Sequence, residues 1–562
     1  MVRWPAVEPR SDPSSTLSPP PAQAWLTIGG LFVLALAVRA VAAATVGFPV
    51  PEDTAYYVGV ARNLVAGRGL VIDSLWSFQT PPLSLPRQAF EIWLPVPTFL
   101  AAIPMAIAGT AASFRAAQVS SVVVSATAPV LAWRACADAA AERRLPPARG
   151  RLLAFGAGAV AAVIGPLVMY GALPDSTAPF AALSLAACLV MARISAVPRG
   201  LRDPRLVLLG ALIGLAALTR SEAVWLALAW LLVAWLWTAG TRRLRAGLIA
   251  IPAVVAGLIY LPWAVRDWQA FGTPLPGQTI ANALYVDHMD VYAYSDPPTL
   301  ARYLGQGLPA ILEAHAAGFA HDLVSVLVTQ GFPIGVLGLL SLPLVWRSRA
   351  LRPLLVFAVL TFTATSLFFP VSTQYGTFLH AAGAIYVLLI VACLFGLDAF
   401  IGRVGRIRHW TRPVAWLGPA FAVAVAIPLC ALSVGGLARN ASDTEARYAQ
   451  LDAALARAGS PLETAGPVIA NFPVWLSEST GVRAVALPDE SPASVLELAR
   501  RFGSRLIVLD LPDAGRHWPA VLSDGSPDAK CFLEVPLTDE NGRTSLDGTP
   551  LAGFHVFRIV CP

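Results

Sequence analysis

Two adjacent carboxylates follow the first long apolar run of the sequence. Glu52 and Asp53 open the stretch PEDTAYYVGVARNLVAGRGLV, residues 51–71, which continues with two tyrosines and a short helical pattern. A carboxylate at the mouth of a membrane segment could act as a general base, since it can take a proton from a hydroxyl group within hydrogen-bonding reach. A structural role competes, because an acid at a helix start also caps the helix and complements its dipole. Capping explains one acid better than it explains the pair.

The residues after Asp53 follow a helical pattern. Apolar or aromatic side chains recur with helical spacing at Tyr57, Val60, Ala61, Leu64 and Val65. Gly67 is suited to end such a helix. The pattern predicts an amphipathic helix on the membrane surface, with Asp53 at its start and facing the lipid headgroup layer.

The composition places these acids in a membrane protein. Of 562 residues, 56% are hydrophobic and 13% are charged, and the mean hydropathy is +0.64. An ordinary soluble domain carries about 25% charged residues. The predicted fold class is therefore mostly α, a polytopic transmembrane helix bundle. The lipid bilayer is an expected partner, and we expect no nucleic-acid partner.

Apolar runs recur along the chain at lengths that approach or cross a bilayer. They lie near 24–48, 92–110, 116–136, 152–173, 178–193, 206–219, 223–239, 246–262, 323–346, 353–369, 381–400 and 414–436. Several short connections are rich in arginine, which marks the cytoplasmic side. The alternation predicts that 263–322, 370–380 and everything after 437 lie outside, and that 1–23 is a disordered cytoplasmic tail.

The first loop, 49–91, can be placed in two ways. If both 24–48 and 92–110 cross fully, the N-terminus is outside and the two acids are cytoplasmic. Two prolines in EIWLPVPTFL, near the start of 92–110, disfavour a spanning helix there. We therefore favour a cytoplasmic tail, about eleven full crossings and an external position for Glu52 and Asp53.

The chain changes character after residue 437. PVIANFP, RAVALP, RLIVLDLP, CFLEVP and FHVFRIVC are typical of short strands, and SPASVLELARRFG is typical of a helix with a serine cap. These segments predict a small extracytoplasmic α/β domain over 437–562, after a transmembrane domain over 24–436. Cys531 and Cys561 could form a disulfide if this domain faces an oxidising compartment.

No cofactor is expected, and no spacing supports a divalent metal ion. None of the six cysteines lies in a zinc-binding pattern. The segment YVDHMDVYAYSD groups Asp287, His288 and Asp290 with three tyrosines, but such a short match is weak evidence for a metal. A polar, aromatic wall for a sugar or an acceptor is a better interpretation, and a plain solvent loop is better still.

The stretch PEDTAYYVGVARNLVAGRGLV resembles the first external loop of the GT-C glycosyltransferases, specifically the bacterial group allied to protein mannosyltransferases and lipid A aminoarabinose transferases. That loop has an acidic pair after the first membrane helix, then an aromatic residue, then an ARNL…G.G stretch. PPLSLPRQAFEIWLPVPTFL, LPWAVRDWQAFGTPLPG and YGTFLHAAGAIY resemble three further segments of the same layout. The likeness covers most of 24–435 and implies a GT-C fold.

This resemblance implies an enzyme that transfers a hexosyl or pentosyl group, with inversion, from a polyprenyl-phosphate sugar to a glycan, lipid or protein acceptor. The reaction would take place at the external face of a bacterial inner membrane. Asp53 falls where the family's base lies, and Glu52 takes the first acidic position. This chain has Glu-Asp where relatives often have Asp-Glu or Asp-Asp, so either acid could be the base, and we favour Asp53.

The resemblance leaves the phosphate ligands open. Relatives carry a basic residue where this chain has Tyr56 and a lysine where it has Thr80. Arg266, beside Trp263 at an external helix end, is the preferred cation, with interfacial snorkelling as its alternative. Arg87 could substitute for the missing lysine.

Four other residues belong to the predicted external face. His380, at a helix start, could donate to a phosphate, although a lone histidine is more often structural. Trp93, in the proline-rich segment, is a further candidate for contact with substrate. Arg220 and Glu222 in LTRSE form a short turn and could pair with each other.

Two functions from other classes compete with the enzyme. A lipid or solute transporter would carry ionisable groups near the membrane midplane. Here Arg39 and Asp398 are the charges inside apolar runs, and neither has an evident partner in the sequence. A non-catalytic protein that organises cell-envelope assembly is the third possibility.

Overall fold

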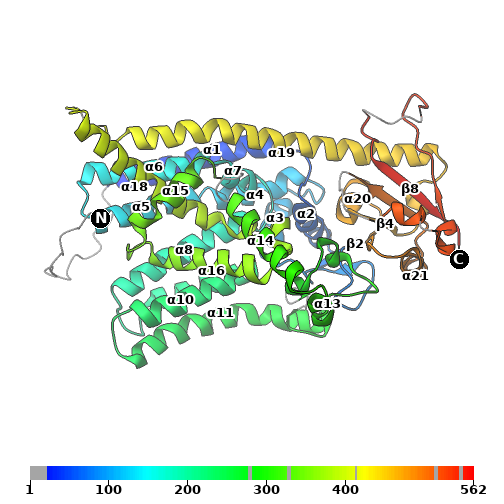
Figure 1. Cartoon of the computed structure of the whole chain (residues 1–562), viewed down its shortest axis with the longest axis horizontal. Helices are drawn as coiled ribbons and strands as arrows, with labels where there is room; N and C mark the ends of the chain where they lie inside the picture. The colour runs from blue at the N-terminus through cyan, green and yellow to red at the C-terminus, as the bar shows by residue number, and fades with distance from the viewer. Residues whose placement is uncertain are drawn as a thin grey trace.

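The computed structural model describes residues 22–275, 281–325, 331–411, 414–511, 517–523, 525–543 and 549–561. Most of the predicted N-terminal tail lies outside these residues. The described chain forms a long helical bundle with a small α/β domain at one end, and α19 runs along the bundle into that domain (Figure 1). The predicted fold class is confirmed.

Apolar helices build the bundle. The longer ones are α1 (Ala22–Thr45), α8 (Thr177–Ala196), α11 (Arg242–Phe271), α18 (Gly383–Ile407) and α19 (Leu417–Arg457), and the shorter ones are α3 (Val96–Ile107), α4 (Phe114–Ser125), α5 (Ala128–Glu142), α6 (Pro147–Val163), α7 (Gly165–Met169), α9 (Pro204–Ala217), α10 (Ala223–Trp237), α14 (Leu308–Val324), α15 (Ile334–Val345) and α16 (Arg352–Phe368). Large apolar side chains on the outside are strongly exposed, such as Leu26 at 78% and Leu340 at 72%. A surface of this kind is costly in water and favourable in hydrocarbon.

Six described helices are long and apolar enough to cross a membrane: α1, the joined pair α4 and α5, α8, α11, α18 and α19. A seventh candidate is α6 with α7, a pair bent by 59°. The other predicted crossings fall on shorter apolar helices, so fewer helices qualify by length than the eleven expected. The 12 residues of α3 reach only about 18 Å, which agrees with the expectation that 92–110 does not cross.

Two charged residues inside the bundle have partners that the sequence does not reveal. Arg39 of α1 is fully buried and donates to the carbonyls of Ala161 and Ala162 at 3.3 and 3.1 Å. These carbonyls lie at the end of α6, where the break before α7 removes their helical partners. Asp398 of α18 accepts two hydrogen bonds of 2.7 Å from Arg149 at the start of α6. Both charges are therefore compensated.

The α/β domain is built on a six-stranded sheet with the strand order β2-β5-β4-β6-β8-β7. Its elements are β2 (Ser74–Leu75), β4 (Val468–Ala470), α20 (Pro473–Thr480), β5 (Ala484–Ala486), α21 (Pro492–Phe502), β6 (Leu506–Asp510), β7 (Phe532–Glu534) and β8 (Phe554–Ile559). The first four strands in this order are parallel to one another. β8 runs antiparallel to both of its neighbours, β6 and β7. The five predicted strands, the Ser491 cap of α21 and the Cys531–Cys561 disulfide are confirmed.

This domain is joined to the first loop, 49–91, more closely than the sequence indicates. β2 comes from that loop and pairs with β5, although it is far away in the sequence. Arg62 of α2 (Glu52–Val65) donates two hydrogen bonds of 2.8 and 2.6 Å to Glu478 of α20. α19 continues without a break to Arg457, so the predicted boundary after residue 436 falls inside a helix. The first loop and the C-terminal domain are therefore one structural unit.

α2 (Glu52–Val65) matches the predicted helix in extent but not in environment. Most of its side chains from Thr54 to Ala61 are buried. It packs against α3, α20 and β1 (Val71–Ile72), which pairs with β3 (Arg87–Gln88). The prediction of a helix on the membrane surface was wrong, because the C-terminal domain and the rest of the loop cover the faces of α2.

Candidate active site

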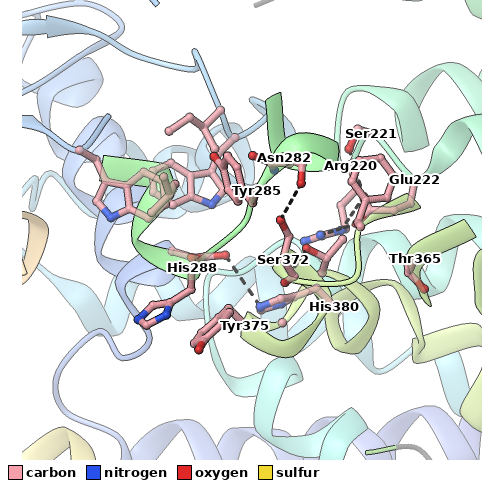
Figure 2. Close-up of a pocket in the computed structure, with 18 of the residues that line it drawn as sticks. Arg220, Ser221, Glu222, Asn282, Tyr285, His288, Thr365, Ser372, Tyr375 and His380 are labelled. Carbon is pink, nitrogen blue, oxygen red and sulfur yellow. Dashed lines mark hydrogen bonds and ion pairs between the residues drawn. The ribbon is translucent and has the colours of Figure 1, made fainter. Parts of the chain in front are cut away.

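Four segments that connect or begin helices meet at the first loop. They are the start of α2, the turn between η1 (Tyr170–Ala172) and α8, the turn between α9 and α10, and the segment of η5 (Ser372–Tyr375) and α17 (Thr377–Ala381). Three of them, the start of α2, the turn between α9 and α10, and the segment of η5 and α17, line a cavity of about 290 Å³ together with η2 (Asn282–Leu284) and η3 (His288–Tyr292) (Figure 2). Its lining includes Asp53, Trp93, Arg220, Tyr285, His288, Tyr375 and His380.

Asp53 lies in a wall that this cavity shares with a second one. The second cavity has a volume of about 620 Å³, and Asp53, Tyr375 and His380 line both. The Asp53 side chain is 25% exposed, and it does not cap α2, because the cap position is Pro51 and no side chain caps this helix. Capping therefore does not explain Asp53, which as an acid in the first turn of α2 still complements the helix dipole.

Asp53 belongs to a cluster with His380 and Asp175. The His380 Nε2 atom lies 3.8 Å from Asp53 Oδ2, and its Nδ1 atom lies 3.4 Å from Asp175 Oδ1. The Thr177 hydroxyl donates to Asp175 Oδ1 at 2.6 Å and lies 2.7 Å from His380 Nδ1. A hydroxyl has one proton, so Thr177 accepts its second hydrogen bond from a protonated Nδ1. The ring is thereby oriented with Nε2 towards Asp53.

Burial and charge act in opposite directions on the three titrating groups. Burial raises the pKa of the Asp53 carboxyl, and the charges of His380 and Arg220 oppose this only in part. Burial would lower the pKa of His380, but the carboxylates of Asp175 and Asp53 outweigh it and raise that pKa. Burial would raise the pKa of Asp175, yet His380 and the Thr177 hydrogen bonds bring it down to about 2. Asp175 is therefore ionised beside a protonated imidazole, and Asp53 is a stronger base than an exposed aspartate.

The same three residues also fit a divalent cation. Asp53, Asp175 and His380 each offer one ligand atom, and these atoms lie within 4.8 Å of one another. The Asp175 Oδ2 atom is buried and has no hydrogen-bond partner among the described residues. Carboxylate and imidazole ligands suit several divalent metals. In a second arrangement, a cation would be held by Asp53 and His380 Nε2 alone, and Asp175 would orient the imidazole ring through Nδ1.

Arg220 is the arginine that lines the cavity. Its guanidinium donates to both oxygens of Glu222, at 3.1 and 2.6 Å (Figure 2). It also donates to the Ser176 hydroxyl at 2.8 Å. The predicted pairing of Arg220 with Glu222 is confirmed. Glu222 and Ser176 hold the guanidinium at the cavity wall, where it can meet an anionic ligand.

Aromatic side chains form much of the remaining wall. Tyr285, His288 and Tyr292 line the cavity from one side, and His288 stacks on Tyr375 with ring centroids 4.5 Å apart. Trp93 lines it as well. The expectation that YVDHMDVYAYSD is a plain solvent loop was wrong, and the interpretation as a polar, aromatic wall agrees with the structure.

Two of the three acids of that segment, Asp287 and Asp290, have structural roles. The Asp287 carboxylate accepts from the Met289 N–H at 2.8 Å, which caps η3. The Asp290 carboxylate completes the capping box and pairs with Arg302 at 2.6 Å. Among the described residues, Asp287 and His288 belong to no group of three metal-ligating side chains.

The Glu52 carboxylate makes different contacts from that of its neighbour Asp53. It accepts from the Trp76 indole at 3.2 Å and from the Val474 N–H at 3.3 Å, at the N-terminal end of α20. It lines neither of the two cavities. The acidic pair is thus divided between a group at the cavity wall and a link to the C-terminal domain.

Arg87 and Arg266 do not reach the cavities either. Arg87 is fully buried, lies 3.3 Å from Glu91 and donates to two backbone carbonyls of its own loop. Arg266 donates to the Ala89 carbonyl at 2.7 Å and pairs with Asp267 at 3.0 Å. Both guanidinium groups fix the conformation of the first loop, in place of the phosphate binding expected for them.

Tyr56 and Trp263 support the same loop. The Tyr56 hydroxyl accepts from the Phe90 N–H at 2.6 Å, and its ring lies 4.2 Å from that of Trp93. Trp263 packs against Phe90 and beneath the Arg266 guanidinium. Of the predicted binding residues, His380 and Trp93 therefore line the cavity with Asp53. The others do not line it: Arg266, Arg87, Tyr56 and Trp263.

Asp175 and Thr177 are the residues that sequence reasoning missed. They lie in LPDSTAP, where an aspartate two residues before a threonine at a helix start looks like an ordinary cap. An unusual signal does exist, because this short loop between two apolar runs carries an acid without a basic neighbour. That signal does not identify His380, which lies in a distant part of the chain, as its partner.

No family model and no curated protein sequence matches the chain. Solved structures do match. The oligosaccharyltransferase AglB of Archaeoglobus fulgidus, in complex with an inhibitory peptide and a dolichol-phosphate, is 16% identical over 96% of this chain and 76% of its own, with a TM-score of 0.51. ArnT of Cupriavidus metallidurans, bound to undecaprenyl phosphate, is 15% identical over 96% and 98%, also with a TM-score of 0.51. The chain therefore has the GT-C fold that its sequence predicts.

Proposed function

We propose that this protein is a membrane glycosyltransferase that moves a sugar from a polyprenyl-phosphate donor to an acceptor hydroxyl with inversion, and that Asp53 is its base. The observation that carries the proposal is the Asp53 carboxylate in the wall common to two cavities. The fold adds support, since the similar ArnT and AglB structures contain undecaprenyl phosphate and a dolichol-phosphate.

The reaction requires few parts. Asp53 takes the proton of the acceptor hydroxyl while the hydroxyl oxygen bonds to the anomeric carbon. The bond between that carbon and the phosphate oxygen breaks, and the polyprenyl phosphate leaves with the electron pair. Attack opposite the leaving group inverts the anomeric configuration. His380, held by Asp175, keeps a positive charge beside Asp53 throughout.

Arg220 is the proposed ligand of the leaving phosphate. It lines the smaller cavity together with Tyr285 and His288, while Arg87 and Arg266 are engaged with the first loop. A guanidinium that donates to a phosphate oxygen stabilises the negative charge that develops as the bond breaks. The sugar phosphate would occupy this smaller cavity, and the acceptor would approach through the larger one.

The reaction is proposed to occur at the external membrane face. The disulfide Cys531–Cys561 in the C-terminal domain suits an oxidising compartment. The first loop shares a sheet with that domain and so lies on the same side. The arginine-rich connections then lie in the cytoplasm of a bacterial cell, together with the N-terminus.

A transporter fits the described residues less well. The two charges within apolar runs, Arg39 and Asp398, are engaged by helix-end carbonyls and by Arg149. Neither is an unpaired group near a midplane path, which a transporter site would require.

The test measures polyprenyl phosphate released from labelled polyprenyl-phosphate sugars by membranes that carry the wild-type protein. Membranes with equally expressed Asp53→Asn and Glu52→Gln serve as matched samples, with an envelope extract as acceptor. We expect release by the wild type, a loss of about a hundredfold or more for Asp53→Asn, and a smaller loss for Glu52→Gln. Inversion is checked by the anomeric configuration of the product. No release from any donor would contradict the proposal and favour a transporter or an assembly protein.

A further inference from the structure

A third cavity, of about 820 Å³, lies at the end of the bundle remote from the α/β domain. It is formed where the start of α6, the end of α18 and the start of α19 meet, on the left of Figure 1. Its polar lining is Arg149, Asp398, Arg406 and His409. None of these residues takes part in the proposed sugar transfer, so this cavity requires its own explanation.

The cavity carries more positive than negative charge. Asp398 is paired with Arg149, but the Arg406 side chain has no hydrogen-bond or ion-pair partner among the described residues. Both guanidinium groups flank Gly402, since a Cβ atom there would lie 3.6 Å from Arg149 Nη2 and 3.9 Å from Arg406 Nη1. Two cations that share one hollow with a single carboxylate repel each other unless an anion joins them.

The surroundings of the cavity belong to a membrane boundary. Leu152, Ile401 and Val414 give it an apolar lining. Trp410, which also lines it, is 45% exposed, and the nearby Trp416 is 54% exposed. Exposed tryptophans at the ends of apolar helices are typical of the headgroup layer.

From these observations we propose that this cavity binds the phosphate headgroup of an anionic membrane lipid. The phosphate is held by Arg406 and by the Arg149 nitrogen that does not donate to Asp398. The apolar lining accommodates the start of the acyl chains. Basic pockets between transmembrane helices recognise anionic headgroups in this way. The site is independent of the sugar transfer, and either proposal can fail without the other.

The test uses the purified full-length protein in a neutral detergent, titrated with phosphatidylglycerol or phosphatidylcholine, with bound lipid counted by native mass spectrometry. Arg406→Gln removes the unpaired cation. Arg408→Gln removes the same charge at the same bundle end but does not touch the lining, so it controls for general attraction. Inorganic phosphate alone, with the thermal midpoint as readout, tests for a soluble ligand.

We expect the wild type to prefer phosphatidylglycerol, Arg406→Gln to bind it about fivefold more weakly, and Arg408→Gln to match the wild type within about twofold. Equal binding by Arg406→Gln and the wild type would overturn the proposal. Equal losses in both variants would overturn it as well, because they would indicate attraction by surface charge. Stabilisation by inorganic phosphate without binding of phosphatidylglycerol would replace the lipid with a soluble phosphate compound.

Discussion

Asp322 and Asp175 are both almost completely buried, at 0% and 1% exposure, yet their oxygens are satisfied in different ways. In α14, Asp322 accepts hydrogen bonds from the hydroxyls of Thr373 at 2.7 Å and Ser366 at 2.8 Å, so both oxygens are engaged. Asp175 keeps one buried oxygen without a hydrogen-bond partner among the described residues and faces His380. A carboxylate enclosed by hydroxyls holds helices together. A buried carboxylate near a cavity that keeps one oxygen without a hydrogen bond is available for chemistry.

The arginines near the first loop and the cavity repeat this contrast. Arg87 and Arg266 donate to backbone carbonyls and so fix the first loop. Arg220 is held by Glu222 and still lines the cavity. The residue type and its position near the membrane are alike in all three, and the contacts distinguish them.

The largest effect in this comparison is expected for Asp175→Asn. The substitution removes the charge that keeps His380 protonated beside Asp53, and we expect the activation free energy to rise by about 1–3 kcal/mol. We expect turnover to fall roughly tenfold to a hundredfold, with a thermal midpoint close to that of the wild type. Unchanged turnover would remove Asp175 from the site.

Arg220→Gln is expected to lower kcat/KM by about tenfold, because the leaving phosphate loses a charge-assisted hydrogen bond. Arg220→Lys keeps the charge without the forked geometry, and it should recover part of the loss. Steady-state kinetics with a defined donor measures both. If Lys and Gln behave alike and only the thermal midpoint changes, Arg220 is a structural residue like Arg266.

Asp322→Asn should act on stability instead of turnover. It weakens the hydrogen bonds from Thr373 and Ser366, at an expected cost of about 1–3 kcal/mol in the free energy of unfolding. Turnover per folded molecule should stay within about twofold of the wild type. Loss of turnover without loss of stability would contradict the division between the two aspartates.

The smallest effect is expected for removal of metal ions. The Thr177 hydroxyl accepts from a protonated Nδ1 of His380, and the raised pKa favours a proton on Nε2 also. An imidazolium group at this place supplies the positive charge that a cation would bring. Treatment with EDTA should therefore change turnover by less than about twofold. A large loss that Mn²⁺ or Mg²⁺ restores would show that Asp53, Asp175 and His380 form a metal site.

Local patterns predicted the fold well. Short apolar segments identified the strands β4 to β8, and Ser491 marked the start of α21, because these signals lie within a few residues of the element. β2 escaped prediction because it has two residues and pairs with a strand in a distant part of the chain. The predicted environment of α2 was wrong for the same reason, since α20, which covers this helix, lies in a distant part of the chain.

The site was predictable only in part. Asp53 stood out through its position after a membrane helix, but its division of labour with Glu52 depends on Val474 and Trp76, which the sequence does not bring together. Arg266 looked suitable for phosphate because it lies at a helix end beside an aromatic residue. Its engagement with the Ala89 carbonyl is a tertiary contact that no local pattern indicates.

Asp53 is proposed to take part in the chemical step and not to be needed for binding of the substrate. A single-turnover experiment tests this proposal most directly, with donor binding and polyprenyl phosphate release followed in the same samples of wild type and Asp53→Asn. We expect Asp53→Asn to bind the donor with the same affinity as the wild type, within about twofold. We expect its release rate to be lower by about a hundredfold or more. Equal release rates, or a loss explained entirely by weaker donor binding, would contradict the proposal.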